Sequence, residues 1–331
     1  MGSRAITASL PWAPEVTAAS LLESQLEGRR RFLELVADLR PELHRYCARM
    51  TGSTADGEDI VQDTLARAYY LLPEMTELPA LRPWLFRIAH NRALDHLKRY
   101  EARMSEPLEA VQDSARDPAP DPGDAISHQQ AVHAALSRFV ELAPAQRSCV
   151  ILKDVLGHSL EEIGVLLQLS LPAVKASLHR GRLRLRELAG APAVAAPLRH
   201  TSPVVARFVA LCNDRNWDGV RALLAEDVQL DVVSRVQRAG RAVNDYFTNY
   251  ARMQDWSLVP AWLDGREVIA VFRAPGEVRP GYFIELTVED GAIRLIRDFY
   301  HVPYILQDAE TALVWHSVAT LHEKDPGCAT S

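Results

Sequence analysis

The sequence predicts a multidomain protein in which two all-α helical units are followed by an α+β unit with a curved antiparallel sheet. Two patterns lead to this fold class. Between residues 29 and 190, apolar residues recur at spacings of three and four, as on amphipathic helices. Beyond residue 203, Asp264-Gly265 and Asp290-Gly291 each separate two strand-like runs, which is typical of tight hairpins.

Length and composition are those of a globular chain with two or three domains. The 331 residues are 48% hydrophobic and carry a formal net charge of -6. No run approaches the roughly 20 apolar residues of a membrane helix, and the N-terminus lacks the pattern of a signal peptide, so we expect a cytoplasmic protein. The cysteines lie far apart without a CxxC pair, so we expect no metal site, no cofactor and no disulfide framework; only Cys328 is expected to be exposed.

The first helical unit is expected at residues 29–104, after a mobile extension at residues 1–28. Its first helix is predicted over Arg29–Gly52. A second is predicted over Asp56–Leu72 and stops at Pro73, which cannot continue a helix. Opposite the apolar face of this second helix, the sequence predicts a polar, acidic surface made of Glu58, Asp59, Gln62 and Asp63.

The third helix of this unit is predicted over Pro83–Glu101, with aromatic residues near its start and basic residues later. Trp84 is expected either to pack inward or to contact nucleic acid, and the basic run is either a solvated helix end or a surface that reaches phosphates and bases. The candidate contacts are Arg87, Asn91, Arg92, His96, Lys98 and Arg99.

An acidic linker at residues 105–127 leads to the second helical unit at residues 128–190. Within it, Gly157–Leu188 has the pattern of two helices joined by a tight turn. Ser159 and Glu162 form a capping box, which marks the start of the first of these helices.

The second helix of this pair follows a turn at Gln168–Ser170 and is capped by Ser170. Its apolar face consists of Val174, Leu178, Gly181, Leu185 and Leu188. The other side and its flanks carry Lys175, Ala176, His179, Arg180, Arg182, Arg184 and Arg186. A helix-turn-helix with a basic outer face is a DNA-reading device, and the alternative is an ordinary solvated basic helix.

The α+β unit is expected at residues 203–307, between a linker at 191–202 and a tail at 308–331. Its candidate pocket residues are Tyr246, Trp256, Trp262, Arg273, Glu285, Tyr300 and His301, although aromatic side chains of this kind often serve only as core. Asp298 and His301 lie three apart in a predicted strand, so we expect them on opposite faces and predict no catalytic pair.

Residues 29–190 resemble an extracytoplasmic-function sigma factor of bacterial RNA polymerase. The motif "DGEDIVQDTLARAY" is close to the family pattern for the helix that docks on the clamp helices of the polymerase largest subunit. The resemblance therefore implies that polymerase is contacted by Asp56, Glu58, Asp59, Gln62 and Asp63. Gly57 stands here where the family usually has Ala.

Two further motifs carry the same resemblance. "PWLFRIAHNRALDHLKR" is similar to the helix that engages the -10 promoter element, with base capture in the preceding loop, Pro73–Leu81. The helix-turn-helix is similar to the -35 reader, which implies DNA contacts from Ser170, Ala173, Lys175, Ala176, His179, Arg180, Arg182, Arg184 and Arg186.

Residues 203–305 resemble the SnoaL-like, ketosteroid-isomerase-like cone that some of these sigma factors carry. The resemblance implies a promoter-specific initiation factor, not an enzyme, that binds core RNA polymerase and promoter DNA and is regulated in cis by its C-terminal domain. The alternative is a small-molecule-sensing or enzymatic SnoaL-like domain that controls a DNA-binding regulator. A plain helix-turn-helix repressor would leave the acidic helix unexplained. An anti-sigma factor or a small-molecule ligand is a further candidate partner.

Overall fold

The computed structural model describes residues 18–72, 80–104, 136–190, 200–253 and 255–309. The predicted base-capturing loop up to residue 79, the acidic linker and most of the C-terminal tail, with Cys328, lie outside these ranges. The helix α1 begins at Ala18, so residues 18–28, which the sequence assigns to the N-terminal extension, are helical here. In that helix Glu27 forms ion pairs with Arg30 and Arg31, at spacings that support a helix.

The first helical unit consists of α1 (Ala18–Val36), α2 (Arg40–Thr51), α3 (Thr54–Leu71) and α4 (Leu81–Met104). Gly52 ends α2 with a left-handed φ of 76°, and the side chain of Ser53 then caps α3 by accepting a hydrogen bond from the Asp56 amide. The tight connection brings α2 and α3 into close contact at Gly57. A Cβ at that position would lie 2.6 Å from the backbone nitrogen of Ala48, which explains why Ala does not stand there.

The second helical unit consists of α6 (Leu136–Val140), α7 (Pro144–Val150), a π-helical turn (Ile151–Val155), α8 (Leu160–Leu167) and α9 (Leu171–Gly190). The predicted capping box is confirmed, since Ser159 and Glu162 exchange both hydrogen bonds at the start of α8. The predicted turn is confirmed as well, because Gln168 ends α8 in the left-handed conformation with φ of 57°.

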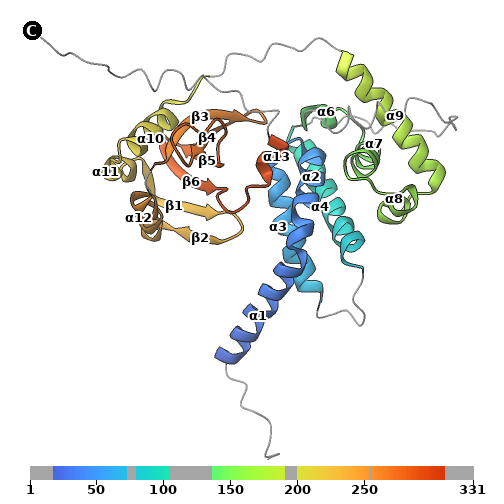
Figure 1. Cartoon of the computed structure of the whole chain (residues 1–331), viewed down its shortest axis with the longest axis horizontal. Helices are drawn as coiled ribbons and strands as arrows, with labels where there is room; N and C mark the ends of the chain where they lie inside the picture. Colours follow the sequence, from blue (N-terminus) through green and yellow to red (C-terminus); the bar gives the residue numbers. More distant parts are fainter. Residues whose placement is uncertain (1–17, 73–79, 105–135, 191–199, 254, 310–331) are drawn as a thin grey trace, which may run out of the picture.

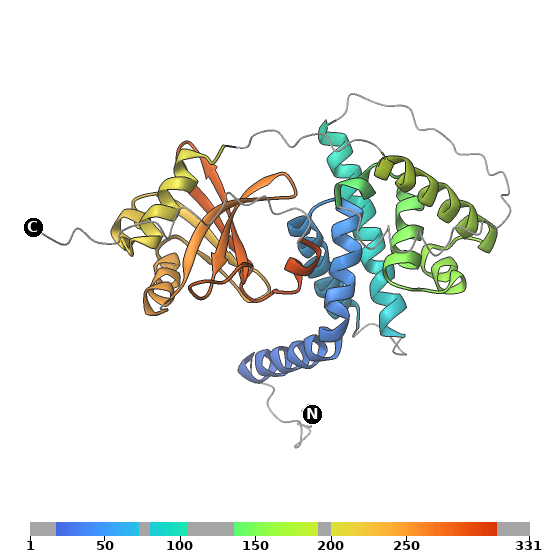
Figure 2. The same cartoon turned by 45° about the horizontal axis from the view of Figure 1, so that its top comes forward.

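The two helical units share one hydrophobic core, in which Tyr46 and Phe86 of the first lie with Phe139 and Ile151 of the second. Arg147 joins the units through its buried guanidinium, which donates to the backbone oxygens of Met50, Val140 and Leu142. Figure 2 shows α4 side by side with the second unit. The candidate -10 helix is therefore packed against the helix-turn-helix in this structure.

The C-terminal unit is an α+β domain, so the predicted fold class is confirmed. Its helices are α10 (Pro203–Asn213), α11 (Trp217–Arg221), α12 (Asn244–Arg252) and α13 (Ile305–Ala309). Its strands are β1 (Leu224–Val232), β2 (Val236–Ala239), β3 (Ser257–Leu263), β4 (Arg266–Phe272), β5 (Tyr282–Glu289) and β6 (Ala292–Asp298), with a 3-10 turn at Gly240–Val243 before α12.

The strands form one mixed sheet in the order β2-β1-β6-β5-β4-β3. The prediction of an antiparallel sheet is wrong for one pair of strands, since β1 runs parallel to β6. The two strands are far apart in the chain, with β2, α12 and the strands β3–β5 between them, so no hairpin forces them to be antiparallel. Both predicted hairpins are confirmed. Asp264-Gly265 joins β3 to β4 and Asp290-Gly291 joins β5 to β6, with positive φ at all four turn residues.

The sheet buries a different core on each face. One core holds Phe208 and Phe247 from α10 and α12, and the other holds Phe283 and Phe299 together with Ala55 of α3. Figure 1 accordingly shows the sheet between the helices α10–α12 and the helices α2–α3, with α13 packed against the latter pair. The C-terminal unit thus lies directly on the acidic helix α3.

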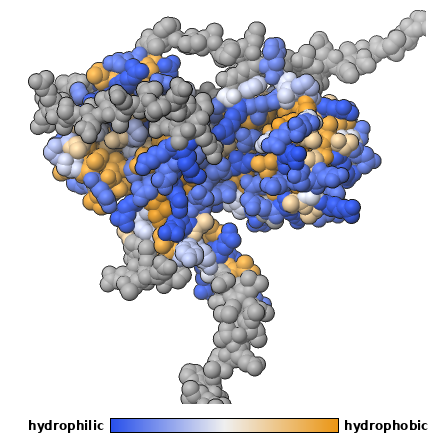
Figure 3. Space-filling model, turned by 180° about the vertical axis from the view of Figure 1, so that it is seen from behind, coloured by the Kyte–Doolittle hydropathy of each residue, from blue (hydrophilic) through white to orange (hydrophobic). Residues whose placement is uncertain are grey.

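The face of the molecule in Figure 3 is mostly hydrophilic, with hydrophobic side chains gathered in several groups. Three cysteines, Cys47, Cys149 and Cys212, are buried as predicted, and burial raises the pKa of each thiol. Within the described ranges, no helix combines the length and the apolar character that a bilayer span requires.

Candidate functional site

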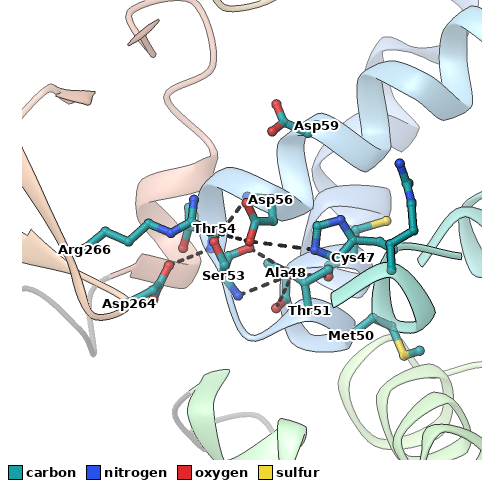
Figure 4. Close-up of polar contacts among 12 residues, drawn as sticks. Cys47, Ala48, Met50, Thr51, Ser53, Thr54, Asp56, Asp59, Asp264 and Arg266 are labelled. Atoms are coloured by element: carbon teal, nitrogen blue, oxygen red, sulfur yellow. Dashed lines mark hydrogen bonds and ion pairs between the residues drawn. The ribbon is translucent and has the colours of Figure 1, made fainter. Parts of the chain in front are cut away.

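The β3–β4 hairpin contacts the N-terminus of α3 (Figure 4). The Asp264 carboxylate accepts a hydrogen bond of 2.6 Å from the backbone N–H of Thr54, the first residue of α3. Arg266 donates to Asp56 at 2.7 Å. The first N–H groups of a helix have no partner within the helix and favour a negative charge, so Asp264 acts as a second cap supplied by another domain.

Asp59, one turn further along α3, forms an ion pair with Arg297 of β6. Arg297 also lies 3.3 Å from Glu285 and 3.6 Å from Asp231, so one buried guanidinium joins three carboxylates. Half of the Asp59 side chain is exposed, and loss of solvent around the other half raises the pKa of Asp59 to about 6 against the opposite effect of Arg297. Glu285 was a candidate pocket residue; the structure places it at this contact, on the other face of the sheet.

Glu58 is fully buried, so the prediction that it lies on an exposed acidic surface is wrong. Its carboxylate forms an ion pair with Arg40 of α2 and accepts a hydrogen bond of 2.7 Å from the hydroxyl of Tyr304. Tyr304 belongs to the segment between β6 and α13, which packs over this face of α3. The helical pattern placed Glu58 opposite the apolar stripe, and the C-terminal unit then covered it.

The two remaining candidate residues of α3 are less enclosed. Gln62 is half-buried and Asp63 is exposed. Both line a groove of about 620 Å³ between α1, α3 and the β1–β2 turn. All five candidate residues of α3 therefore either bond to the C-terminal unit or line the groove beside it: Asp56, Glu58, Asp59, Gln62 and Asp63.

On α4, the side chains of Arg87, Asn91, Lys98 and Arg99 are exposed. Arg92 and His96 are half-buried, and His96 Nε2 lies 3.9 Å from a carboxylate oxygen of Asp56. Trp84 is 6% exposed and lies in the core, as one of its two interpretations predicted. The exposed side chains give α4 a polar and basic surface.

On α9, Lys175 and Arg184 are exposed, and His179, Arg180 and Arg186 are half-buried. Ser170 is exposed and caps the helix, since its hydroxyl accepts from the Ala173 N–H at 3.4 Å.

Two of the predicted outward positions on α9 are corrected by the structure. Ala176 is 4% exposed, because the buried face of α9 is wider than the apolar face that the sequence pattern predicts. Arg182 donates two hydrogen bonds to Asp154 of the π-helical turn, at 2.6 and 2.9 Å, and is thereby held against the protein.

The C-terminal unit contains a cavity of about 350 Å³ between β1, β2, α12 and the end of β6. Of the candidate pocket residues, Tyr246, Tyr300 and His301 line it. Trp256 lies in the core, with the Arg215 guanidinium 3.8 Å from its ring centroid. The Arg273 guanidinium lies over the rings of Tyr282 and Tyr300. Trp262 lies on β3, away from the cavity.

Asp298 is the buried polar centre of this cavity, at 2% exposure. One carboxylate oxygen accepts from the hydroxyls of Tyr246 and Tyr250, at 2.7 and 2.9 Å, and the other accepts from the Tyr300 N–H at 2.8 Å. Burial raises the pKa of Asp298 in spite of these donors.

Asp298 and His301 line the same cavity, so the prediction that they face opposite sides is wrong. β6 ends at Asp298, and the chain turns directly afterwards, so the alternation of a strand does not reach His301.

Sequence reasoning missed Tyr250 and Tyr282. Tyr250 lies four residues after Tyr246 on one face of α12, and this spacing was a usable signal. Within the part of the chain that the structure describes, no group of three or more His, Cys, Asp or Glu side chains is placed to hold a metal ion.

Two family models match the chain: Sigma-70 region 2 over residues 35–103 and Sigma-70, region 4 over residues 132–185. The ECF RNA polymerase sigma factor SigG of Mycobacterium tuberculosis (strain CDC 1551 / Oshkosh) is 32% identical over 211 residues, which cover 56% of this chain and 56% of SigG. The chain thus spans about half the length of SigG.

The ECF RNA polymerase sigma factor SigM of Mycobacterium tuberculosis (strain Erdman) is 33% identical over 178 residues, which cover 53% of this chain and 86% of SigM. Among solved structures, the extracytoplasmic function sigma factor SigJ of Mycobacterium tuberculosis is 22% identical, with a TM-score of 0.32, and the match covers 83% of this chain and 98% of SigJ.

Proposed function

Since the chain belongs to the extracytoplasmic-function sigma factor family, we propose that it binds core RNA polymerase and directs promoter-specific initiation of transcription. In this proposal α3 docks on the clamp helices of the largest subunit, α4 engages the -10 element and α9 reads the -35 element. The exposed basic side chains of α4 and α9 support the two DNA-binding roles, because cations positioned on phosphates supply most of the affinity for DNA.

The C-terminal unit is proposed to regulate this activity in cis by covering α3. One observation carries this part: Asp56, Glu58 and Asp59, which the family resemblance assigns to polymerase, are each bonded to a side chain of the C-terminal unit. Polymerase and the C-terminal unit would then compete for one surface. The affinity for polymerase would be reduced by the fraction of chains in which the C-terminal unit remains docked.

A transcription assay tests both parts. We expect core polymerase to make promoter-specific transcripts with residues 1–200, and fewer with the full chain at equal concentration. Residues 1–200 retain the shared helical core, whose members all lie between Phe32 and Leu185. Core polymerase alone is the control. Absence of transcripts with either protein contradicts the initiation function, and equal yields contradict regulation by covering.

The role of α9 has its own test. Lys175→Ala should weaken binding of the polymerase complex to promoter DNA and reduce the slope of log affinity against log salt by about 1, since one phosphate contact is lost. Binding to polymerase without DNA should not change. Arg207→Ala removes an exposed cation from α10 and is the matched control. A loss of polymerase binding in Lys175→Ala would show that α9 has been given the wrong role.

A further inference from the structure

The cavity of the C-terminal unit has the size and lining of a ligand site. Its volume of about 350 Å³ lies within the range of pockets that hold small organic molecules. Leu230, Val232 and Met253 line it together with the rings of tyrosines on α12, β5 and the β6 end. Walls of this kind fit a ligand with a compact apolar or aromatic body.

The hydrogen bonds at the inner end select a donor on the ligand. Tyr246 and Tyr250 both direct their protons to Asp298. The Tyr282 hydroxyl lies 2.5 Å from that of Tyr250, and either oxygen could donate by geometry alone. Because the Tyr250 proton is directed to Asp298, we assign Tyr282 as the donor in this pair. The hydroxyl oxygens of Tyr246 and Tyr282 are then left with lone pairs, which accept from a hydroxyl group rather than from a carbonyl.

The rim of the cavity is positively charged. It carries Arg235, Arg238 and His301. Arg238 is neutralised by Asp245 at 3.1 Å, and burial together with Arg235 lowers the pKa of His301, so this ring is uncharged near pH 7. Arg235 is exposed and forms no ion pair with the residues that the structure describes. A ligand with an anionic end would meet the Arg235 guanidinium at this rim.

We propose that this cavity binds a small hydroxylated carboxylic acid with an apolar ring body, its hydroxyl on Tyr246 and Tyr282 and its carboxylate at Arg235. We further propose that occupancy of the cavity is linked to the docking of the C-terminal unit on α3, and this second part rests on the proposed function.

The link is physical, because one short segment serves both sites. Asp298, Tyr300 and His301 line the cavity. Arg297 and Tyr304, at either end of the same segment, bind Asp59 and Glu58 of α3. A ligand that holds this segment in one arrangement must change the stability of the docked state, and docking must change ligand affinity by the same factor.

Calorimetric titration of the full chain tests the ligand class with 6-hydroxy-2-naphthoate as the probe. We expect it to bind about tenfold more tightly than 2-naphthoate, which lacks the hydroxyl, and than 2-naphthol, which lacks the carboxylate. Absence of binding by the probe, or equal binding of all three compounds, overturns the assignment.

Two variants locate the probe in the cavity. Tyr282→Phe should remove the preference for the hydroxylated compound and leave 2-naphthoate binding unchanged, and Arg235→Ala should remove the preference for the carboxylate over 2-naphthol. Arg241→Ala, an exposed cation on the 3-10 turn before α12, is the control. If Tyr282→Phe binds both naphthoates as the unaltered chain does, the hydroxyl contact is overturned.

The link to docking is measured with a full-length chain carrying Asp56→Ala and Asp59→Ala, which removes carboxylates of α3 remote from the cavity. We expect its probe affinity to differ from that of the unaltered chain by at least about threefold. If the double variant and the unaltered chain bind the probe with equal affinity, the proposed link between the cavity and docking is overturned, but the proposed ligand site is not. Neither titration contains polymerase or DNA, so failure of the ligand site and failure of the initiation function give separate results.

Discussion

A full-length chain carrying Asp264→Gly and Arg266→Ala is expected to bind core RNA polymerase about thirtyfold more tightly than the unaltered chain. The two changes remove the hydrogen bond to the Thr54 N–H and the ion pair with Asp56. Hydrogen bonds to charged groups contribute about 1.5 to 3 kcal/mol each when buried. Arg266 is 44% exposed, so we assign about 2 kcal/mol to both contacts together, which converts to the stated factor.

The substitution at position 264 preserves the hairpin, because Asp264 has a positive φ of 49° and Gly adopts that conformation without strain. Binding is measured by titrating labelled chain with core polymerase. Arg294→Ala is the matched control, since Arg294 pairs with Asp227 on β1 and makes no contact with α3. An unchanged or weaker affinity in the double variant would mean that the C-terminal unit does not compete with polymerase for α3.

Local signals predicted most of the secondary structure. The capping box of Ser159 with Glu162 and the two Asp-Gly turns act within a few residues, so each was visible in the sequence and each is confirmed. The family was also predicted from motifs that lie within single helices, and it is confirmed by the two matching models and by SigM.

The errors arose where distant parts of the chain meet. Glu58 lies on the polar side of its helix, and nothing local shows that Tyr304, 246 positions later, covers it. The parallel pairing of β1 with β6 likewise depends on how the sheet closes and not on either strand alone. Asp298 and His301 share a cavity because β6 ends between them, and strand ends are less marked in a sequence than turns are.

The buried ion pair of Glu58 with Arg40 is expected to have the largest effect on stability. In Glu58→Ala the free energy of unfolding should fall by about 3 to 5 kcal/mol, because the Arg40 guanidinium, at 14% exposure, is left without its carboxylate. The Tyr304 hydroxyl loses its acceptor in the same variant. Urea denaturation of the full chain, followed by circular dichroism, measures the change.

Two further variants show whether the stability lost in Glu58→Ala comes from the unpaired Arg40 charge or from the loss of packed side-chain atoms. Tyr304→Phe leaves the ion pair in place but removes two hydrogen bonds, one donated to Glu58 and one accepted from Arg40, and should cost about 2 kcal/mol. The double variant Arg40→Met with Glu58→Leu replaces the pair by apolar side chains of similar length, and should recover most of the stability that Glu58→Ala loses. If the double variant is as unstable as Glu58→Ala, the unpaired guanidinium is not the cause of the loss. If Glu58→Ala is as stable as the unaltered chain, Glu58 is not held in the buried pair, and the covering of α3 by the Tyr304 segment is contradicted with it.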